Sequence, residues 1–194
     1  VTGNTLGLWC AYGTTCNITP GTVAYNNVAF SGHYTTINLG GGTMTIDGNL
    51  SFGDTYGAGY TTQPLNNGTL NVKGNIAVTS WGFRGTAVIN ALGGTGTTLG
   101  QPATAGFPTG TFTVNKDSVT DTMSLTSAIT LYGTGQAMTI TRGTVNLAGY
   151  NLTVPGALTV AANGRLICNG GTVTAGSTSI VGEMSCGPTL GITW

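Results

Sequence analysis

The chain has 194 residues and a formal net charge of zero, and 5% of its residues are charged, against about 25% in an average soluble domain. Phosphate binding needs a concentrated basic patch and the Lys and Arg residues are scattered, so this composition excludes a nucleic-acid partner and disfavours an anionic membrane surface. No run of about 18 apolar residues occurs, so no membrane span is predicted. So little charge gives weak repulsion between copies, which predicts self-association.

Residues 1–33 are predicted to form the N-terminal cap of a single elongated domain, residues 1–194. The cap contains Cys10 and Cys16, and the other cysteines, Cys168 and Cys186, lie near the C-terminus. Their even number predicts two disulfides in an oxidising compartment, and of three possible connectivities the two local pairs are favoured. Zinc is disfavoured because no pair has C-x2-C spacing. Because the chain begins at Val1 rather than Met, we expect a secreted protein whose signal peptide has been removed.

Gly-Thr followed by alternating residues recurs along the chain and is typical of a turn that leads into a strand. These units begin at Gly42, Gly68, Gly85, Gly110, Gly143 and Gly171. Alternation with period two predicts one buried face per strand. The predicted inward pairs are Met44 and Ile46, Leu70 and Val72, Phe112 and Val114, and Val145 and Leu147. The turns Asp47-Gly48 and Lys73-Gly74 fit either hairpins or corners between successive sides of a coil.

The second half of the chain contains two contrasting segments. Residues 91–110 have no periodicity and are rich in Gly and Pro, which predicts a long surface loop. Residues 139–194 carry closely spaced short strands and are predicted to be C-terminal coils. Between them, Asp117 and Asp121 lie in a polar stretch with Lys116, which we interpret as a solvated turn.

The fold is predicted to be all-β, because no window combines helical periodicity with helix caps. We expect a parallel β-solenoid, or β-helix, in which short strands stack in successive coils. Short strands at intervals of about 8–12 residues also fit an antiparallel β-sandwich or jelly roll, which stays the alternative.

The Gly-Thr units, the Gly-Asn and Gly-Gly corners, and the segment 158–167 (LTVAANGRLI) resemble the coils of β-helical surface passenger and adhesin-like repeat proteins. The resemblance covers mainly residues 34–90 and 139–182. It implies a right-handed β-helix exported to the cell surface, with adhesive, filamentous or phage tail-fibre relatives. It transfers no functional residue to this chain.

Catalysis is not expected from these residues. A glycosidase or lyase on a β-helix needs carboxylates that converge on one groove, and the acidic residues are few and dispersed. They are Asp47, Asp54, Asp117, Asp121 and Glu183. The single histidine, His33, has no carboxylate near it in sequence. The sequence therefore predicts no catalytic residue, no cofactor and no metal site.

The favoured function is a non-enzymatic structural subunit of an extracellular filament, sheath or appendage, whose partner is the chain itself. Terminal strands would join subunits by strand addition. The candidate subunit contacts are Trp9, Tyr12, Ile192 and Trp194.

Two alternatives remain open. A carbohydrate-binding adhesin or phage tail-fibre module would use residues 56–62 and Trp81 to bind a surface carbohydrate. An ice-binding protein would use Thr-x-Thr triplets, such as those at Thr43, Thr111 and Thr139, although their irregular spacing argues against a flat array.

Overall fold

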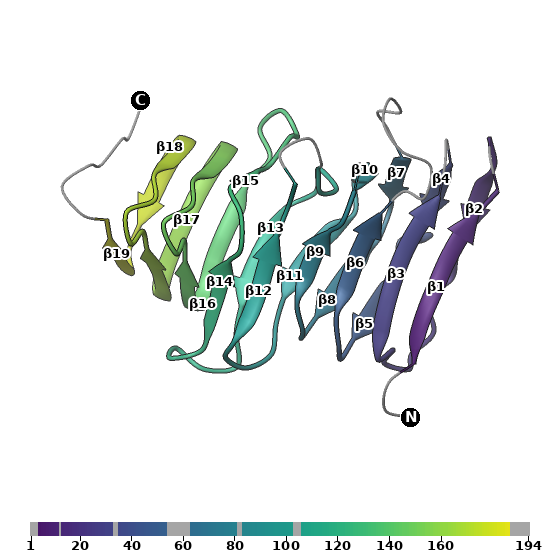
Figure 1. Cartoon of the computed structure of the whole chain (residues 1–194), viewed down its shortest axis with the longest axis horizontal. Coiled ribbons are helices and arrows are strands. Elements are labelled where there is room, and N and C mark those ends of the chain that lie inside the picture. Colours follow the sequence, from purple (N-terminus) through teal and green to yellow (C-terminus); the bar gives the residue numbers. More distant parts are fainter. Residues whose placement is uncertain are drawn as a thin grey trace.

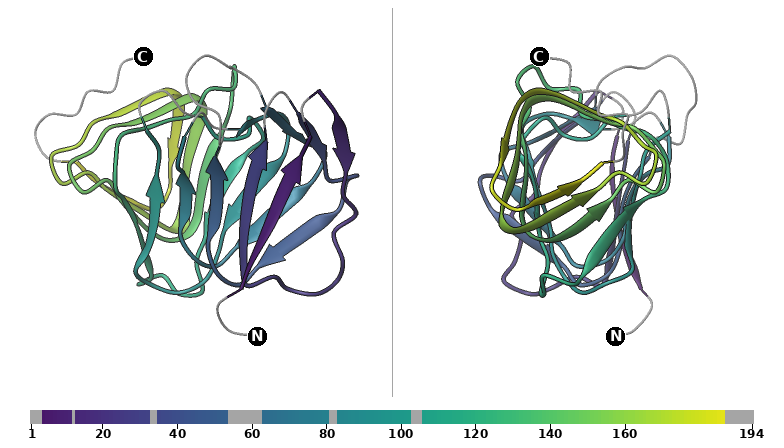
Figure 2. Two further views of the ribbon diagram at one scale, coloured as in Figure 1. Left: turned by 45° about the vertical axis from the view of Figure 1, so that its right-hand side comes forward. Right: turned by 90° about the vertical axis from the view of Figure 1, so that its left-hand side faces the viewer.

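The computed structural model describes residues 4–11, 13–32, 35–53, 63–80, 83–102 and 106–186. These residues form β-strands, turns and bends, with no helix among them that could span a bilayer. The strands stack as a β-solenoid of about seven turns (Figure 1). Seen along the stack, successive coils lie over one another around a shared interior (Figure 2).

Each coil contributes to three sheets, which we call I, II and III. Sheet I contains β5 (Thr43–Ile46), β8 (Thr69–Val72), β11 (Val88–Ala91), β13 (Phe112–Asn115) and parts of β16 (Met138–Asn146), β17 (Leu152–Ile167) and β18 (Val173–Ile180). Sheet II contains β1 (Thr5–Cys10), β3 (Asn27–Gly32), β6 (Leu50–Gly53), β9 (Ile76–Val78), β12 (Thr97–Gly100), β14 (Thr122–Leu125), the ends of β16 and β17, and β19 (Glu183–Ser185). Sheet III contains β2 (Thr15–Asn17), β4 (Thr36–Asn38), β7 (Gln63–Asn66) and β10 (Phe83–Arg84), and then β15 (Ile129–Thr130) with the starts of β17 and β18.

The strand pairings of the described residues are parallel, which confirms the solenoid prediction and makes the antiparallel alternative wrong. The turn at Asp47-Gly48 is a corner, because β5 before it pairs with β8 whereas β6 after it pairs with β3 and β9. Lys73-Gly74 forms the equivalent corner one coil later, where the Gly74 amide donates to the Gly48 carbonyl at 2.9 Å.

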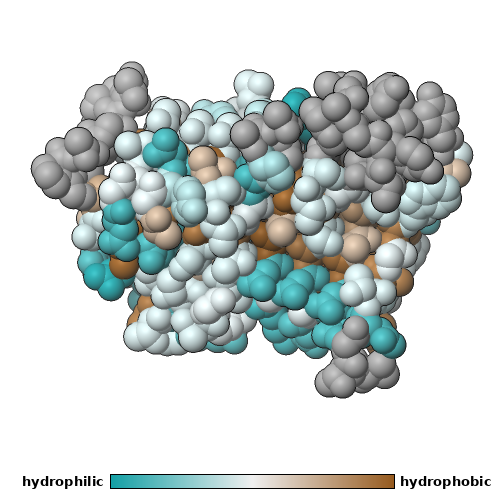
Figure 3. All heavy atoms as spheres, viewed as in Figure 1, coloured by the Kyte–Doolittle hydropathy of each residue, from teal (hydrophilic) through white to brown (hydrophobic). Residues whose placement is uncertain are grey.

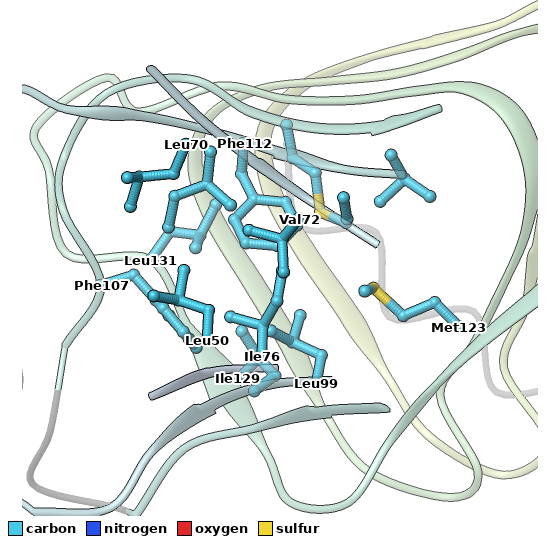
Figure 4. Packing of buried hydrophobic residues seen from close by; sticks show 14 of the residues in the cluster. Leu50, Leu70, Val72, Ile76, Leu99, Phe107, Phe112, Met123, Ile129 and Leu131 are labelled. Carbon is cyan, nitrogen blue, oxygen red and sulfur yellow. The ribbon is translucent and has the colours of Figure 1, made fainter. Parts of the chain in front are cut away.

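The interior is filled by columns of apolar side chains, one from each coil. In sheet I, register places Met44 beside Leu70, Leu70 beside Ile89, and Ile89 beside Phe112. The inward pairs predicted from the alternation are all buried. Figure 4 shows side chains of sheets I and II pointing into the same interior, with Phe107, Ile129 and Leu131 beside them. Alternation thus encodes the core directly.

The prediction of a surface loop over residues 91–110 is wrong in its central part. Residues 97–100 form β12, which continues sheet II, and Leu99 and Phe107 are buried in the core. The Gly-rich sequence around β12 forms corners of the same coil. The Gly-Thr units at Gly143 and Gly171 also differ from the other four, because they lead into sheets II and III rather than sheet I.

Asparagine side chains join successive coils where the corner meets sheet II. The backbone N–H of Asn49 donates to Asn27 Oδ1 at 2.8 Å, and the backbone N–H of Asn75 donates to Asn49 Oδ1 at 2.8 Å. In the next coil, the backbone N–H of Thr98 donates to Asn75 Oδ1 at 2.9 Å. Figure 3 shows hydrophilic surface along the lower ends of β3, β6 and β9, where this column lies. The side chains satisfy amides that the corner geometry leaves without a strand partner.

Sheet III is interrupted between β10 and β15 in the described residues, and two buried glutamines supply hydrogen bonds there. Gln101 accepts from the Thr130 amide at 3.1 Å and donates to the Thr130 carbonyl at 3.2 Å, as a strand partner would. Gln136 donates to the carbonyls of Pro108 and Gly110, both at 2.8 Å. Their amide groups therefore replace backbone pairing where strands are missing.

The close stacking of corners generates a prediction at Gly74. A Cβ at this position would overlap the carbonyl oxygen of Gly48, so Gly74→Ala forces neighbouring coils apart. We expect the free energy of unfolding to fall by about 1–3 kcal/mol, measured by urea denaturation. Gly94→Ala is the control, because a Cβ there meets no atom within 4 Å. Equal destabilisation by both variants would contradict the stacking argument.

Candidate assembly surfaces at the two ends of the stack

The N-terminal end of the stack exposes strand edges and apolar side chains. Within the described residues, β1 pairs with β3 alone and β2 pairs with β4 alone, so one edge of each strand has no strand beside it. Trp9 on β1 is 60% exposed, and Val23 in the same coil is 64% exposed. An open hollow of about 580 Å³ lies beside the start of β1 and is lined by Asn4, Thr5, Leu6, Ala24, Tyr25, Asn26, Asn27 and Asp47.

The C-terminal end has the same two properties. In the described part of the chain, β18 and β19 pair with β17 and with no later strand. Ile180 at the end of β18 is 39% exposed, and Val181 beside it is 73% exposed. Exposed apolar side chains next to unpaired edges are the ordinary chemistry of strand-to-strand association.

The two disulfides lie at the two ends of the described stack: Cys10–Cys16 is within the first coil, and Cys168–Cys186 links the last coil to the coil before it. Cys10–Cys16 joins the end of β1 to β2, and Cys168–Cys186 joins the end of β17 to the residue after β19. These are the local pairs predicted from the sequence, and they indicate an oxidising environment. Terminal coils have one neighbour instead of two, so they are the coils that fray most readily. A cross-link at each end holds the outermost strands in place.

The charged groups do not converge on a site in the described residues. Asp47 pairs with Lys73, and Glu183 pairs with Arg165, each at 2.7 Å on the surface. Asp121 Oδ2 accepts from the Ser118 amide at 2.7 Å within its own turn. The described part of the chain contains no group of three or more His, Cys, Asp or Glu side chains that could hold a metal ion. The two surface ion pairs add little to stability, because solvent screens them.

Lys116 corrects the interpretation of the segment around it as a solvated turn. The inward alternation of Phe112 and Val114 continues past the strand end, so the Lys116 side chain turns into the core and is 1% exposed. Its Nζ donates to the Leu92 carbonyl at 2.5 Å and to Thr97 Oγ1 at 2.8 Å. Burial lowers the pKa of Lys116 below its usual value of 10.5, against the opposing influence of Asp121 and Asp117. Asp117 itself is exposed.

Of the predicted subunit contacts, the structure places Trp9 at the N-terminal end. Tyr12, Ile192 and Trp194 lie outside the described residues, as do His33, Asp54, Trp81 and residues 56–62. The sequence reasoning missed Val23, Ile180 and Val181. Val23 follows a further Gly-Thr pair at Gly21-Thr22, and Ile180 and Val181 lie at and directly after the end of β18. The strand pairing was needed to show that these residues belong to the outermost described coils.

Removing a disulfide is expected to loosen one end of the stack. The enclosed separations are 18 residues for Cys168–Cys186 and 6 for Cys10–Cys16. Chain-entropy arguments then give losses of about 3 and about 2 kcal/mol for the paired Cys→Ala variants. Hydrogen exchange should rise in β19 for the first variant and in β1 and β2 for the second. Uniform faster exchange across the central coils would contradict this local role.

The buried amine of Lys116 gives a pH-dependent prediction. Between its lowered pKa and 10.5, the unfolded chain holds a proton that the folded chain does not, so the free energy of unfolding rises with pH in that interval. Lys116→Met should lack this rise. Urea denaturation at a series of alkaline pH values below 10.5 measures both slopes. Lys73→Met is the control, because the ion pair with Asp47 raises the pKa of the exposed Lys73 above 10.5 and so moves its titration out of this interval. Identical slopes for the parent and Lys116→Met would refute the assignment.

Comparison with known proteins returns no relative: no family model, no curated protein and no solved structure matches the chain. The chain is therefore described by its own architecture, an all-β parallel solenoid of about seven turns with a disulfide near each end of the stack.

Proposed function

We propose that this protein is a non-enzymatic structural subunit of an extracellular filament, sheath or appendage, and that subunits join end to end. The observation that carries the proposal is the chemistry of the two ends. Trp9 and Val23 at one end and Ile180 and Val181 at the other are exposed beside strand edges. The contact joins two different surfaces of the same chain, and such head-to-tail contacts produce open polymers when the rotation does not close a ring.

The energetics of such a contact are favourable on two counts. Stacking one end on the other would continue the parallel ladder and give partners to backbone groups at the edges. Burying a large apolar side chain such as Trp9 or Val181 adds about 1.5–3 kcal/mol each. The disulfides support the same contact, because an edge already held in strand geometry loses less entropy when it binds.

Low charge supports self-association in place of binding to a charged partner. With 5% charged residues and no net charge, copies repel one another weakly. The disulfides fit export to an oxidising space, which is why we assign the assembly to the cell exterior. Adhesin or tail-fibre activity stays a prediction, since residues 56–62 and Trp81 lie outside the described residues.

The proposal is tested by Val181→Lys. Adding a charge at the C-terminal end should abolish polymers, because the ammonium group would be desolvated in the contact without a partner. Electron microscopy and sedimentation at neutral pH measure the result. Val119→Lys is the matched control, since Val119 is also an exposed valine, at 49%, but lies in the corner between β13 and β14. A parent protein that stays monomeric at all concentrations would overturn the proposal.

A further inference from the structure

The outer face of sheet I carries two continuous columns of uncharged side chains, most of them polar, although the sequence spacing of the units is irregular. Strand register aligns one residue from each coil in the first column: Thr45, Asn71, Asn90, Thr113, Thr139, Thr159 and Ser179. The insertions that make the spacing irregular occur elsewhere in the coils. The sequence argument against a flat array therefore does not hold for the folded chain.

A second column runs parallel to the first, two residues earlier in each strand. It contains Thr43, Thr69, Val88, Thr111, Ala137, Ala157 and Ser177. The register shifts in this sheet fall between Val114 and Asn115, between Ile140 and Arg142, and between Val154 and Ala157. Those positions flank the columns, so the columns themselves are uninterrupted.

The columns form a lattice with fixed dimensions. Neighbouring strands lie about 4.8 Å apart, and residues two apart on one strand lie about 6.6 Å apart. Neither column contains a charged residue. Threonine is stiff at χ1 because it is β-branched, and Asn90 Nδ2 donates to Asn71 Oδ1 at 2.9 Å, which holds both amides in place. Most side chains of the first column are half-buried against their neighbours, so they lose little conformational entropy when the face binds a ligand.

We infer that the outer face of sheet I binds the surface of ice. Hydroxyl and amide groups at lattice positions hold first-layer water, and the threonine and alanine methyl groups between them restrict where that water lies. Water ordered with a repeat similar to that of the oxygen rows in hexagonal ice can merge with a growing crystal. A polysaccharide ligand is less suited to this face, since neither column contains an aromatic ring for a sugar to stack on.

The outer faces of the other sheets serve as comparisons. On sheet II, register aligns Gly7, Ala29, Ser51, Ala77 and Gly100, a column with a single hydroxyl group. The neighbouring outward column of sheet II is polar but is made mainly of asparagine: Asn27, Asn49, Asn75, Thr98, Ser124 and Asn146. On sheet III, Thr130, Thr153 and Thr174 align, but the sheet is interrupted before β15 and the column is short. Sheet I thus combines length, hydroxyl content and neutrality. The inference is independent of the proposed end-to-end contact, which uses other residues.

The test measures thermal hysteresis and adsorption of the fluorescently labelled full chain to a single ice crystal. Thr139→Lys places a long cation inside the first column, between Thr113 and Thr159, and should remove most of the hysteresis and the adsorption. Thr174→Lys makes the same substitution at an exposed threonine of sheet III and should retain both activities.

Circular dichroism and urea denaturation must show that both variants are folded, and Thr159→Lys provides a second variant if Thr139→Lys is not. A parent protein without hysteresis or adsorption would overturn the inference. Equal loss in Thr139→Lys and Thr174→Lys would also overturn it, because the binding face would then not be sheet I. Binding to chitin or cellulose with no effect on ice would replace it with a carbohydrate site.

Discussion

Each coil of the solenoid supplies backbone partners to the coil before it and the coil after it, and this in-register parallel pairing determines the other features of the molecule. Side chains at equivalent positions must stack on one another, so an inward position is apolar in coil after coil, as Met44, Leu70 and Ile89 show. Corners must also stack, which requires Gly at positions such as Gly74. Where the backbone ladder stops, side chains provide the missing hydrogen bonds to the backbone: asparagine side chains at the corners and glutamine side chains beside sheet III.

The period-two pattern made the fold class and the core predictable. Alternation identifies the inward residues without knowledge of which strands pair, because every sheet of the solenoid buries one face. The two disulfides were also predictable, because each joins cysteines that are close together in the sequence. The choice of solenoid over sandwich rested on the recurring Gly-Thr units and the closely spaced short strands of the C-terminal third, and the parallel pairing confirms it.

Other features depend on how strands from different coils pair, which the sequence of a single strand does not show. Residues 91–110 looked like a loop because β12 is short and flanked by glycines, and the tertiary pairing of Leu99 with Ile76 and Leu125 overrides that local signal. Lys116 looked solvated because lysine usually is, but alternation continues past the strand end and the Leu92 carbonyl accepts from it. The outward columns of sheet I required the register of every coil, which the irregular loop lengths conceal.

The interruption of sheet III has a mechanical consequence. Between β10 and β15 the described residues form backbone ladders along sheets I and II. On the third side they are joined by glutamine amides, by the Thr109 amide and hydroxyl, which both donate to the Gly85 carbonyl, and by aromatic rings that pack across the interior from sheet II. Phe52 lies 5.6 Å from Phe83 and 6.3 Å from Phe107, centroid to centroid. Ring contacts tolerate sliding that a hydrogen-bond ladder does not, because dispersion forces are weakly directional. Under a bending load, the sheet III side between β10 and β15 would deform more easily than the other two sides. The polymer proposed above would therefore flex within each subunit as well as at the contacts between subunits.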